Sequence, residues 1–223
     1  MNPRYERNIP ALSEAECGIL LGKRVLVVGC GGLGGHLIDM LARIGVGTLR
    51  VVDGDVFEPS NLNRQLLSEV PLLGISKAQA AAARVNRVNP EISVEAVNHF
   101  LTEENVSRLL LHCDVVLDGL DNIESRRILA KECERAGIPY IYGAVNGWIA
   151  QAAISMPGDG LVQMLYPEGA VLKNKSVLSF TPALCASMQV ALCVKLLTGR
   201  PVETGKLYYF DLLEQEFESI PMI

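Results

Sequence analysis

The chain has 223 residues, of which 49% are hydrophobic and 20% charged, a balance typical of a globular α/β protein and unlike that of a disordered or fibrous chain. Its formal net charge of −5 lacks the basic footprint of proteins that bind a phosphate backbone, so nucleic acid is not expected as a partner. Charged residues occupy the N-terminal stretch where a secretory signal needs an apolar core, and the most apolar late stretch, residues 183–194, is shorter than the roughly 20 residues that span a bilayer. We therefore expect a cytoplasmic protein without a membrane-spanning helix.

Short apolar runs alternate with helical periodicity through the first part of the chain, after an N-terminal arm at residues 1–12. Strands are predicted at 24–28, 48–53, 92–97, 115–118 and 140–143, and helices at 14–21, 33–44, 76–88, 102–111 and 123–136. This alternation predicts an α/β fold with a doubly wound, Rossmann-like, mostly parallel sheet and helices on both faces. Such sheets bind ligands at the carboxyl ends of their strands.

The pattern changes after Asn146. A strand at 149–156 precedes a crossover loop at about 157–178, which has no clear period, and a helix is then expected between Pro182 and Gly199. Residues 206–211 and 214–218 are predicted to pair as a short antiparallel C-terminal extension. The length suits one large domain, so residues 1–223 are expected to fold together.

A glycine-rich turn follows the first strand and precedes a helix. Gly29, Gly31, Gly32 and Gly34 fit the pattern G-x-G-x-x-G, which lets backbone amides approach phosphates at a helix N-terminus. Asp53, at the end of the second strand, is placed to accept hydrogen bonds from ribose hydroxyls. These residues fit either NAD or an adenine nucleotide, and a tight strand-to-helix turn without a ligand is the structural alternative.

The segment after Asp53 carries charged and amide side chains that point to a triphosphate. It contains Asp55, Asn61, Arg64 and Gln65, and Lys77 opens the next predicted helix. A reaction at a triphosphate must neutralise several negative charges, which Arg64 and Lys77 would do. The alternative is that both are ordinary surface charges.

Asp121 follows the apolar strand at 115–118, so it is expected at the same edge of the sheet. A carboxylate there suits Mg²⁺ on triphosphate oxygens, because magnesium sites commonly combine one or two carboxylates with substrate phosphates. Helix capping is the alternative role for Asp121.

These motifs together resemble the ThiF/MoeB/HesA family, the adenylating relatives of ubiquitin-activating enzymes. The resemblance rests on Arg4-Tyr5-x-Arg7, VVGCGGLG, VVDGDxxxxSNLNRQ, GxxKAxAA, RVNP and LDGLDN, in this order, and reaches nearly to the end of the chain. It implies that Asp53 binds ribose, that Asn61, Arg64 and Lys77 bind phosphates, that Gln65 supports the loop and that Asp121 binds magnesium. It also implies a homodimer in which Arg7 reaches into the neighbouring subunit's site.

The cysteines depart from the pattern of many bacterial members of that family. Those members hold zinc with two C-x-x-C pairs, whereas the six cysteines here, at 17, 30, 113, 133, 185 and 193, form no such pair. We therefore expect no structural zinc. Some members also carry a cysteine shortly before the final helix. This chain has Lys173-Asn174-Lys175-Ser176 in that region, which leaves a covalent intermediate in doubt.

The resemblance implies a nucleotidyltransferase that uses ATP and Mg²⁺ to adenylate the C-terminal glycine carboxylate of a small β-grasp sulfur-carrier protein ending in Gly-Gly. A separate sulfur donor would then form the thiocarboxylate. The carrier and its pathway, whether thiamin, molybdopterin or another, stay open at this point. Three alternatives remain: a family member that activates a small molecule or a tRNA base, an NAD-dependent oxidoreductase, and a nucleotide-binding scaffold without activity.

Overall fold

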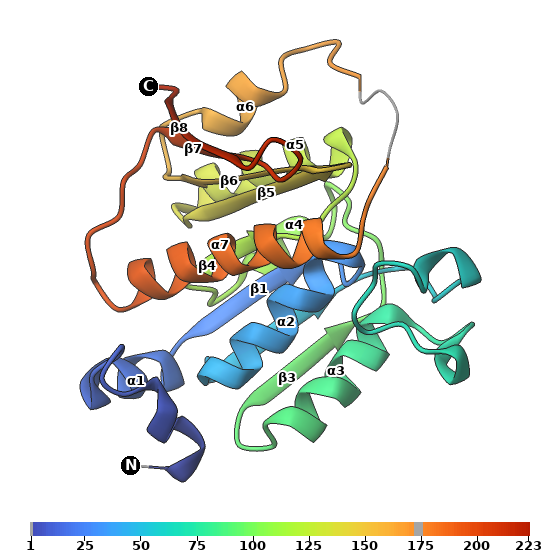
Figure 1. Ribbon diagram of the computed structural model, residues 1–223, viewed down its shortest axis with the longest axis vertical. Helices are drawn as coiled ribbons and strands as arrows, with labels where there is room; N and C mark the ends of the chain where they lie inside the picture. Colours follow the sequence, from blue (N-terminus) through green and yellow to red (C-terminus); the bar gives the residue numbers. More distant parts are fainter. Residues whose placement is uncertain (1, 172–175) are drawn as a thin grey trace.

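The computed structural model describes residues 2–171 and 176–223, and an eight-stranded sheet runs through its centre (Figure 1). The strands are β1 (Arg24–Val28), β2 (Thr48–Val52), β3 (Ser93–Val97), β4 (Val115–Asp118), β5 (Tyr140–Asn146), β6 (Ile149–Ser155), β7 (Lys206–Asp211) and β8 (Glu216–Pro221). They lie in the order β3-β2-β1-β4-β5-β6-β7-β8. The strands from β3 to β5 are parallel, and β6, β7 and β8 are each antiparallel to the strand before them. The predicted doubly wound sheet with an antiparallel C-terminal extension is thus confirmed.

Helices cover both faces of the sheet. One face carries α1 (Glu14–Leu21), α2 (Gly32–Ile44), α3 (Lys77–Val88) and α7 (Phe180–Leu197), and Figure 1 shows α2 lying between α3 and α7. The opposite face carries α4 (Val106–Leu110), α5 (Ile123–Ala136) and α6 (Leu161–Leu165). In β1, Val25 and Val27 join the first core while Leu26 and Val28 join the second, so a continuous apolar run is what a strand covered on both faces requires.

By length and composition, α7 would be long and apolar enough to cross a membrane, with 18 residues and a mean hydropathy of 1.6. It extends beyond the apolar stretch 183–194 that the sequence suggested. In this fold the helix packs against α2, β5 and β6, and Cys185, Gln189 and Cys193 are fully buried there. Helix α7 is apolar because it is buried between the sheet and a neighbouring helix, as is typical of a core helix.

Several predicted elements have different bounds: β5 continues to Asn146, beyond the predicted 143, and α7 spans Phe180–Leu197. Side-chain hydrogen bonds form the turns beside α4 and β8. Helix α4 spans Val106–Leu110, shorter than the predicted 102–111, and the residues before it form a turn in which the side chain of Asn105 accepts from the backbone N of Thr102 at 2.9 Å. Strand β8 begins two residues later than predicted. The Asp211 carboxylate accepts from the backbone N of Leu213 and Glu214 at 2.9 and 3.2 Å, which forms the turn that delays the strand.

The crossover loop contains a helix that sequence periodicity did not reveal. Helix α6 has only five residues, too few to display a period. The Asp159 carboxylate starts it by accepting hydrogen bonds from the backbone N of Met156 and Leu161 and from the Ser155 hydroxyl. Leu161 and Val162 are buried in the core beneath α5 and α6, which anchors this part of the loop.

The N-terminal arm is attached to the amino-terminal end of the sheet. Its residues Pro3–Asn8 form a 3-10 helix, and the Tyr5 ring is buried. The side-chain amide of Asn89 donates to the Tyr5 hydroxyl at 2.8 Å, and the guanidinium of Arg4 donates to the Val88 carbonyl at 2.6 Å. Both partners lie at the end of α3, just before β3 starts. The arm therefore lies at the opposite end of the sheet from the carboxyl ends of the parallel strands (Figure 1).

Three glycines meet where β1, α2 and β4 approach one another. A Cβ atom on Gly34 would lie 1.7 Å from the Gly29 carbonyl oxygen, and one on Gly119 would lie 2.7 Å from that same oxygen. Gly29 itself has a φ of 91°, and its Cβ would lie 2.4 Å from the Gly119 carbonyl oxygen. No side chain fits at these contacts.

We expect Gly34→Ala to lower the free energy of unfolding by about 3 kcal/mol, because the new methyl group overlaps backbone that cannot move without opening the glycine turn. Urea denaturation measures this loss. The matched control is Gly18→Ala in α1, where nothing lies within 4 Å of the added Cβ, so stability should rise slightly. Equal stability of the Gly34 variant and the wild-type chain would show that the helix can move away.

Candidate functional site

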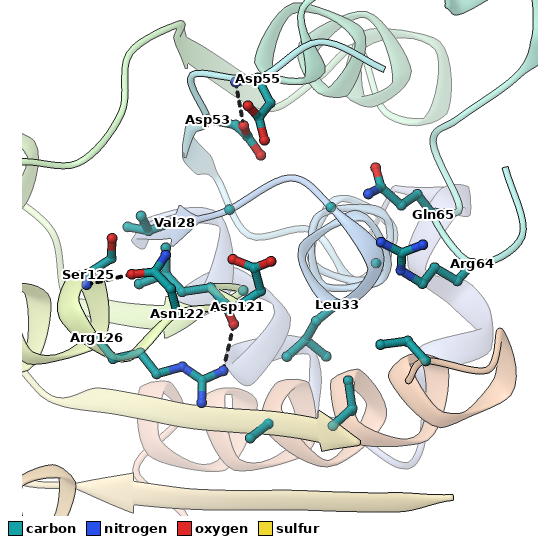
Figure 2. Close-up of a pocket in the computed structure, with 18 of the residues that line it drawn as sticks. Val28, Leu33, Asp53, Asp55, Arg64, Gln65, Asp121, Asn122, Ser125 and Arg126 are labelled. Carbon is teal, nitrogen blue, oxygen red and sulfur yellow. Dashed lines mark hydrogen bonds between the residues drawn. The ribbon is translucent and has the colours of Figure 1, made fainter. Parts of the chain in front are cut away.

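A pocket of about 810 Å³ lies at the carboxyl ends of the parallel strands (Figure 2). Its walls come from the glycine turn after β1, from the loop after β2, from the loop after β3 and from the segment after β4. The chain around β5 and β6, together with Tyr166 and Tyr209, completes the lining. Figure 2 shows Asp53 and Asp55 on one side of this space, Arg64 and Gln65 on another, and Asp121 and Asn122 on a third. Side chains far apart in the sequence thus converge on one cavity.

The glycine turn presents the N-terminus of α2 to the pocket. Gly29, Gly31 and Gly32 line the cavity, and the N-cap residue of α2, Gly31, has no side chain with which to cap the first turn. Backbone N–H groups at an uncapped helix N-terminus attract anions such as phosphates. Gly34 does not line the pocket, and its role is the close contact with Gly29 described above.

Asp53 is fixed at the end of β2 by two backbone donors. Its carboxylate accepts from the N–H of Cys30 at 2.7 Å and from the N–H of Asp55 at 2.8 Å. Burial raises the pKa of Asp53, and these two hydrogen bonds oppose that shift. The carboxylate lines the pocket beside the glycine turn, where the sequence placed it.

Lys77 contributes an almost buried positive charge to the pocket. Its side chain is 9% exposed, and its ammonium group pairs with the Asp55 carboxylate at 3.1 Å. The Lys77 N–H also donates to the Asp55 carbonyl at 2.9 Å, so the loop after β2 is joined to the start of α3. The Asp55 side chain is 55% exposed, so its carboxylate neutralises the Lys77 charge within the cavity only in part.

Arg64 and Gln65 line the pocket from the loop between β2 and α3. The guanidinium of Arg64 donates to the Ser60 carbonyl and to the Asn63 side-chain oxygen, both at 2.9 Å. Gln65 is 7% exposed, and its Oε1 has no hydrogen-bond partner in the described part of the chain. A buried acceptor without a donor is costly, so this atom suits a ligand hydroxyl.

Asn61, which the resemblance assigned to phosphate binding, does not line the pocket. Its side-chain oxygen instead accepts from the backbone N of Glu58 at 3.0 Å and builds the turn that precedes Arg64. The neighbouring Asn63 lines the cavity in its place. The structure therefore gives Asn61 a supporting position behind the wall.

Asp121 lines the pocket, and the cap of α5 is a different residue. Figure 2 shows the Asp121 carboxylate at the edge of the cavity. The cap of α5 is Asn122, whose side-chain oxygen accepts from the N–H of Ser125 at 2.9 Å. Helix capping is thus performed by the following residue.

Arg126 is a functional candidate that the sequence reasoning missed. It lines the pocket from the first turns of α5, and its side chain is only 4% exposed. Its Nε lies 3.2 Å from the carboxylate of Asp118, which is fully buried and also accepts from the Tyr140 hydroxyl at 2.6 Å. Burial acts to lower the pKa of Arg126, but the Asp118 carboxylate and the nearby tyrosines raise it by more. The net shift is upward, so the guanidinium stays charged. The available signal was an arginine on the apolar stripe of α5 that also carries Leu129, Ala130 and Cys133.

Arg7 is not brought to the pocket of its own chain. It is exposed on the N-terminal 3-10 helix, at the opposite end of the sheet. His99, Tyr166 and Tyr209 line the pocket although no sequence pattern singled them out.

All six cysteines are free thiols inside the fold. Burial raises the pKa of five of them: Cys30, Cys113, Cys133, Cys185 and Cys193. Within residues 2–171 and 176–223, no group of three or more histidine, cysteine, aspartate or glutamate side chains is arranged to hold a metal ion. Lys173, Asn174 and Lys175, which stand where some relatives carry a cysteine, lie outside the described residues.

Comparison with known protein families matches residues 5–223 to the ThiF family. The chain belongs to the ThiF family. It is 37% identical to the SAMP-activating enzyme E1 of Haloferax volcanii over 98% of this chain and 84% of that protein. It is 33% identical to the sulfur carrier protein ThiS adenylyltransferase of Bacillus subtilis over 88% of this chain, and it spans 60% of that protein's length. The resemblance predicted from the sequence motifs is confirmed.

A solved structure supports the fold. The Escherichia coli MccB structure with MccA-N7isoASN superposes with a TM-score of 0.87 at 22% sequence identity, and the match covers 99% of this chain and 71% of that one. At this identity the similarity concerns the architecture alone. The structural similarity includes the antiparallel end of the sheet, because the match covers almost the whole chain.

We expect Asp118→Asn to lower the free energy of unfolding by about 3–5 kcal/mol, because it leaves the buried Arg126 charge without its counter-ion. Chemical denaturation followed by circular dichroism measures the change. Glu203→Gln is the matched control, since the Glu203 side chain is 61% exposed in its ion pair with Lys206 and its removal should leave stability unchanged. Similar stabilities for both variants would show that Asp118 is dispensable as a counter-ion.

Proposed function

We propose that this chain uses ATP and Mg²⁺ to adenylate the C-terminal glycine carboxylate of a small β-grasp sulfur-carrier protein that ends in Gly-Gly. The observation that carries the proposal is the convergence in one pocket of Asp53, Lys77, Arg64 and Asp121. Membership of the ThiF family, together with the names of the two relatives given above, supports this type of substrate.

The chemistry needs positioning more than acid–base catalysis. A carboxylate oxygen of the carrier attacks the α-phosphorus of ATP, a bond forms between them, and the bond to the bridging oxygen of the β-phosphate breaks as pyrophosphate leaves. The carboxylate is already ionised at neutral pH, so no general base is required. Arg64 and Lys77 would neutralise the phosphates, and Asp53 would hold the ribose.

Asp121 is the residue proposed to hold magnesium. One carboxylate at the edge of a pocket that also accepts phosphates fits a Mg²⁺ site, which usually completes its ligand set with phosphate oxygens and water. When bound, the ion would screen charge on the triphosphate. The unpartnered Oε1 of Gln65 fits a nucleotide as well, because a ribose hydroxyl can donate to it.

The alternatives are weaker on the same observations. His99, Tyr166 and Tyr209 line the pocket, so a proton donor for hydride-transfer chemistry is not lacking, but family membership favours adenylation over an oxidoreductase. A small-molecule or tRNA substrate would use the same nucleotide-binding residues, and the net charge of −5 disfavours tRNA. Because all six cysteines are buried, we propose that the sulfur comes from a separate donor in the cytoplasm.

Arg7 supports a homodimer as part of this proposal. It is exposed and lies at the far end of the sheet from its own pocket, so a role in binding the nucleotide would place it in another subunit's site. The sequence motif that includes Arg7 belongs to the resemblance described above. A dimer in which each Arg7 reaches the partner's pocket would add a further cation to Arg64, Lys77 and Arg126 there.

Purified chain, ATP and Mg²⁺ should catalyse ATP–pyrophosphate exchange that depends on a Gly-Gly-tailed carrier from the same organism. Arg64→Ala should slow the exchange roughly a hundredfold, because it removes charge stabilisation at the reacting phosphates. Asp121→Ala should abolish the activity together with its magnesium dependence. Arg108→Ala, an exposed arginine of α4 outside the pocket, is the control and should match wild type. If no such carrier supports exchange, the proposed substrate is wrong.

The dimer is tested by mixing inactive Arg7→Ala and Asp121→Ala chains under conditions that exchange subunits. In a mixed dimer, one site combines an intact Asp121 with the partner's intact Arg7, while the other site lacks both. Random association makes about half of the dimers mixed, so roughly a quarter of all sites should recover activity. If exchange is proven and no activity returns, Arg7 does not act in the partner's site.

A further inference from the structure

The pocket has a second region beyond the nucleotide-binding residues. This acceptor half lies between β5, β6, β7 and the crossover loop, and its lining includes Ala144, Val145, Ile149, Gln151, Tyr166 and Tyr209. Arg126 stands where this half meets the loop that carries Asp121. Its contacts connect the two halves.

On the nucleotide side, Arg126 holds the loop after β4. Its Nη2 donates to the Leu120 carbonyl at 2.6 Å and to the Gly143 carbonyl in β5 at 2.9 Å. The Leu120 N–H donates in turn to Asp118 at 2.7 Å, the same carboxylate that pairs with Arg126. The residue before Asp121 is therefore fixed through both its N–H and its carbonyl group.

On the acceptor side, Arg126 holds the crossover loop. Its Nη1 donates to the Tyr166 hydroxyl, which is also 2.7 Å from the Tyr142 hydroxyl. The adjacent Arg127 donates to the Tyr166 carbonyl at 2.9 Å and to the Pro167 carbonyl. Two consecutive arginines of α5 thus bind the stretch that follows α6, one through a side chain and one through the backbone.

We propose that Arg126 and Tyr166 form a clasp that positions the acceptor carboxylate against the α-phosphate. Neither residue is assigned a chemical step. The clasp sets the distance between the crossover loop and the Asp121 loop, and this inference rests on the proposed function, since it names the residues that align its second substrate. Loosening it should displace the acceptor half while the contacts of Asp53, Lys77 and Arg64 with nucleotide stay intact, because a rigid support determines how well two reactants are aligned.

Tyr166→Phe tests the clasp because it removes the hydroxyl and keeps the ring. Loss of this charge-assisted hydrogen bond should lower kcat/KM for a purified Gly-Gly-tailed carrier about tenfold, while the Kd for ATP changes less than twofold. Amide hydrogen exchange should also become faster in residues 161–170. Arg127→Ala loosens the same stretch from the backbone side and should act in the same direction.

Tyr208→Phe is the matched control, because Tyr208 lies outside the pocket lining and its hydroxyl makes one long contact, 3.4 Å, with Glu203. It should change neither kcat/KM for the carrier nor amide hydrogen exchange in residues 161–170. The proposed function fails if the wild-type chain shows no carrier-dependent ATP–pyrophosphate exchange. The clasp fails if wild type is active and Tyr166→Phe keeps its kcat/KM for the carrier, or if that value falls only together with an equal loss of ATP affinity.

Discussion

The contact between Gly29, Gly34 and Gly119 determines how closely β1, α2 and β4 approach one another. A Cβ at any of these positions would lie between 1.7 and 2.7 Å from a neighbouring backbone oxygen, closer than non-bonded atoms approach, so the backbones would have to separate. That separation would move the N-terminus of α2 away from the loop that carries Asp121. The nucleotide pocket therefore depends on the absence of three side chains as much as on the presence of charged ones.

The strand order explains why the loops on either side of this contact diverge. From β1 the chain continues to β2 and β3 on one side of the sheet and later returns to β4 on the other side. The loops after β1 and β4 therefore leave the sheet in different directions, and a crevice opens between them at the carboxyl ends. Arg126 closes the floor of this crevice and pairs with Asp118, so one buried ion pair supports both the Asp121 loop and the crossover loop.

Local sequence signals were sufficient for most of the fold and for part of the site. The glycine turn and the residues at strand ends, such as Asp53 and Asp121, could be placed because parallel strands bring their carboxyl ends to one edge. Arg126 could not, because its role depends on a counter-ion and a tyrosine contributed by distant segments. Asn61 lies behind the pocket wall, and its contact with Glu58 could not be foreseen because an amide in a loop serves equally well as a ligand or as part of a turn. For Arg7, the sequence motif indicates a role in a partner subunit's pocket, which the structure of a single chain does not contain.

The burial of the cysteines has a practical consequence for following motions of this fold. Four thiols belong to the core beneath α2 and α7, and two belong to the core beneath α4 and α5: Cys17, Cys30, Cys185 and Cys193 in the first, and Cys113 and Cys133 in the second. A thiol enclosed in this way reacts with an alkylating reagent only when its surroundings open. The rate at which each native cysteine is alkylated would thus report the opening of its own layer, and no reporter residue would have to be engineered. Cys30, inside the glycine turn, would report directly on the nucleotide-binding end of the molecule.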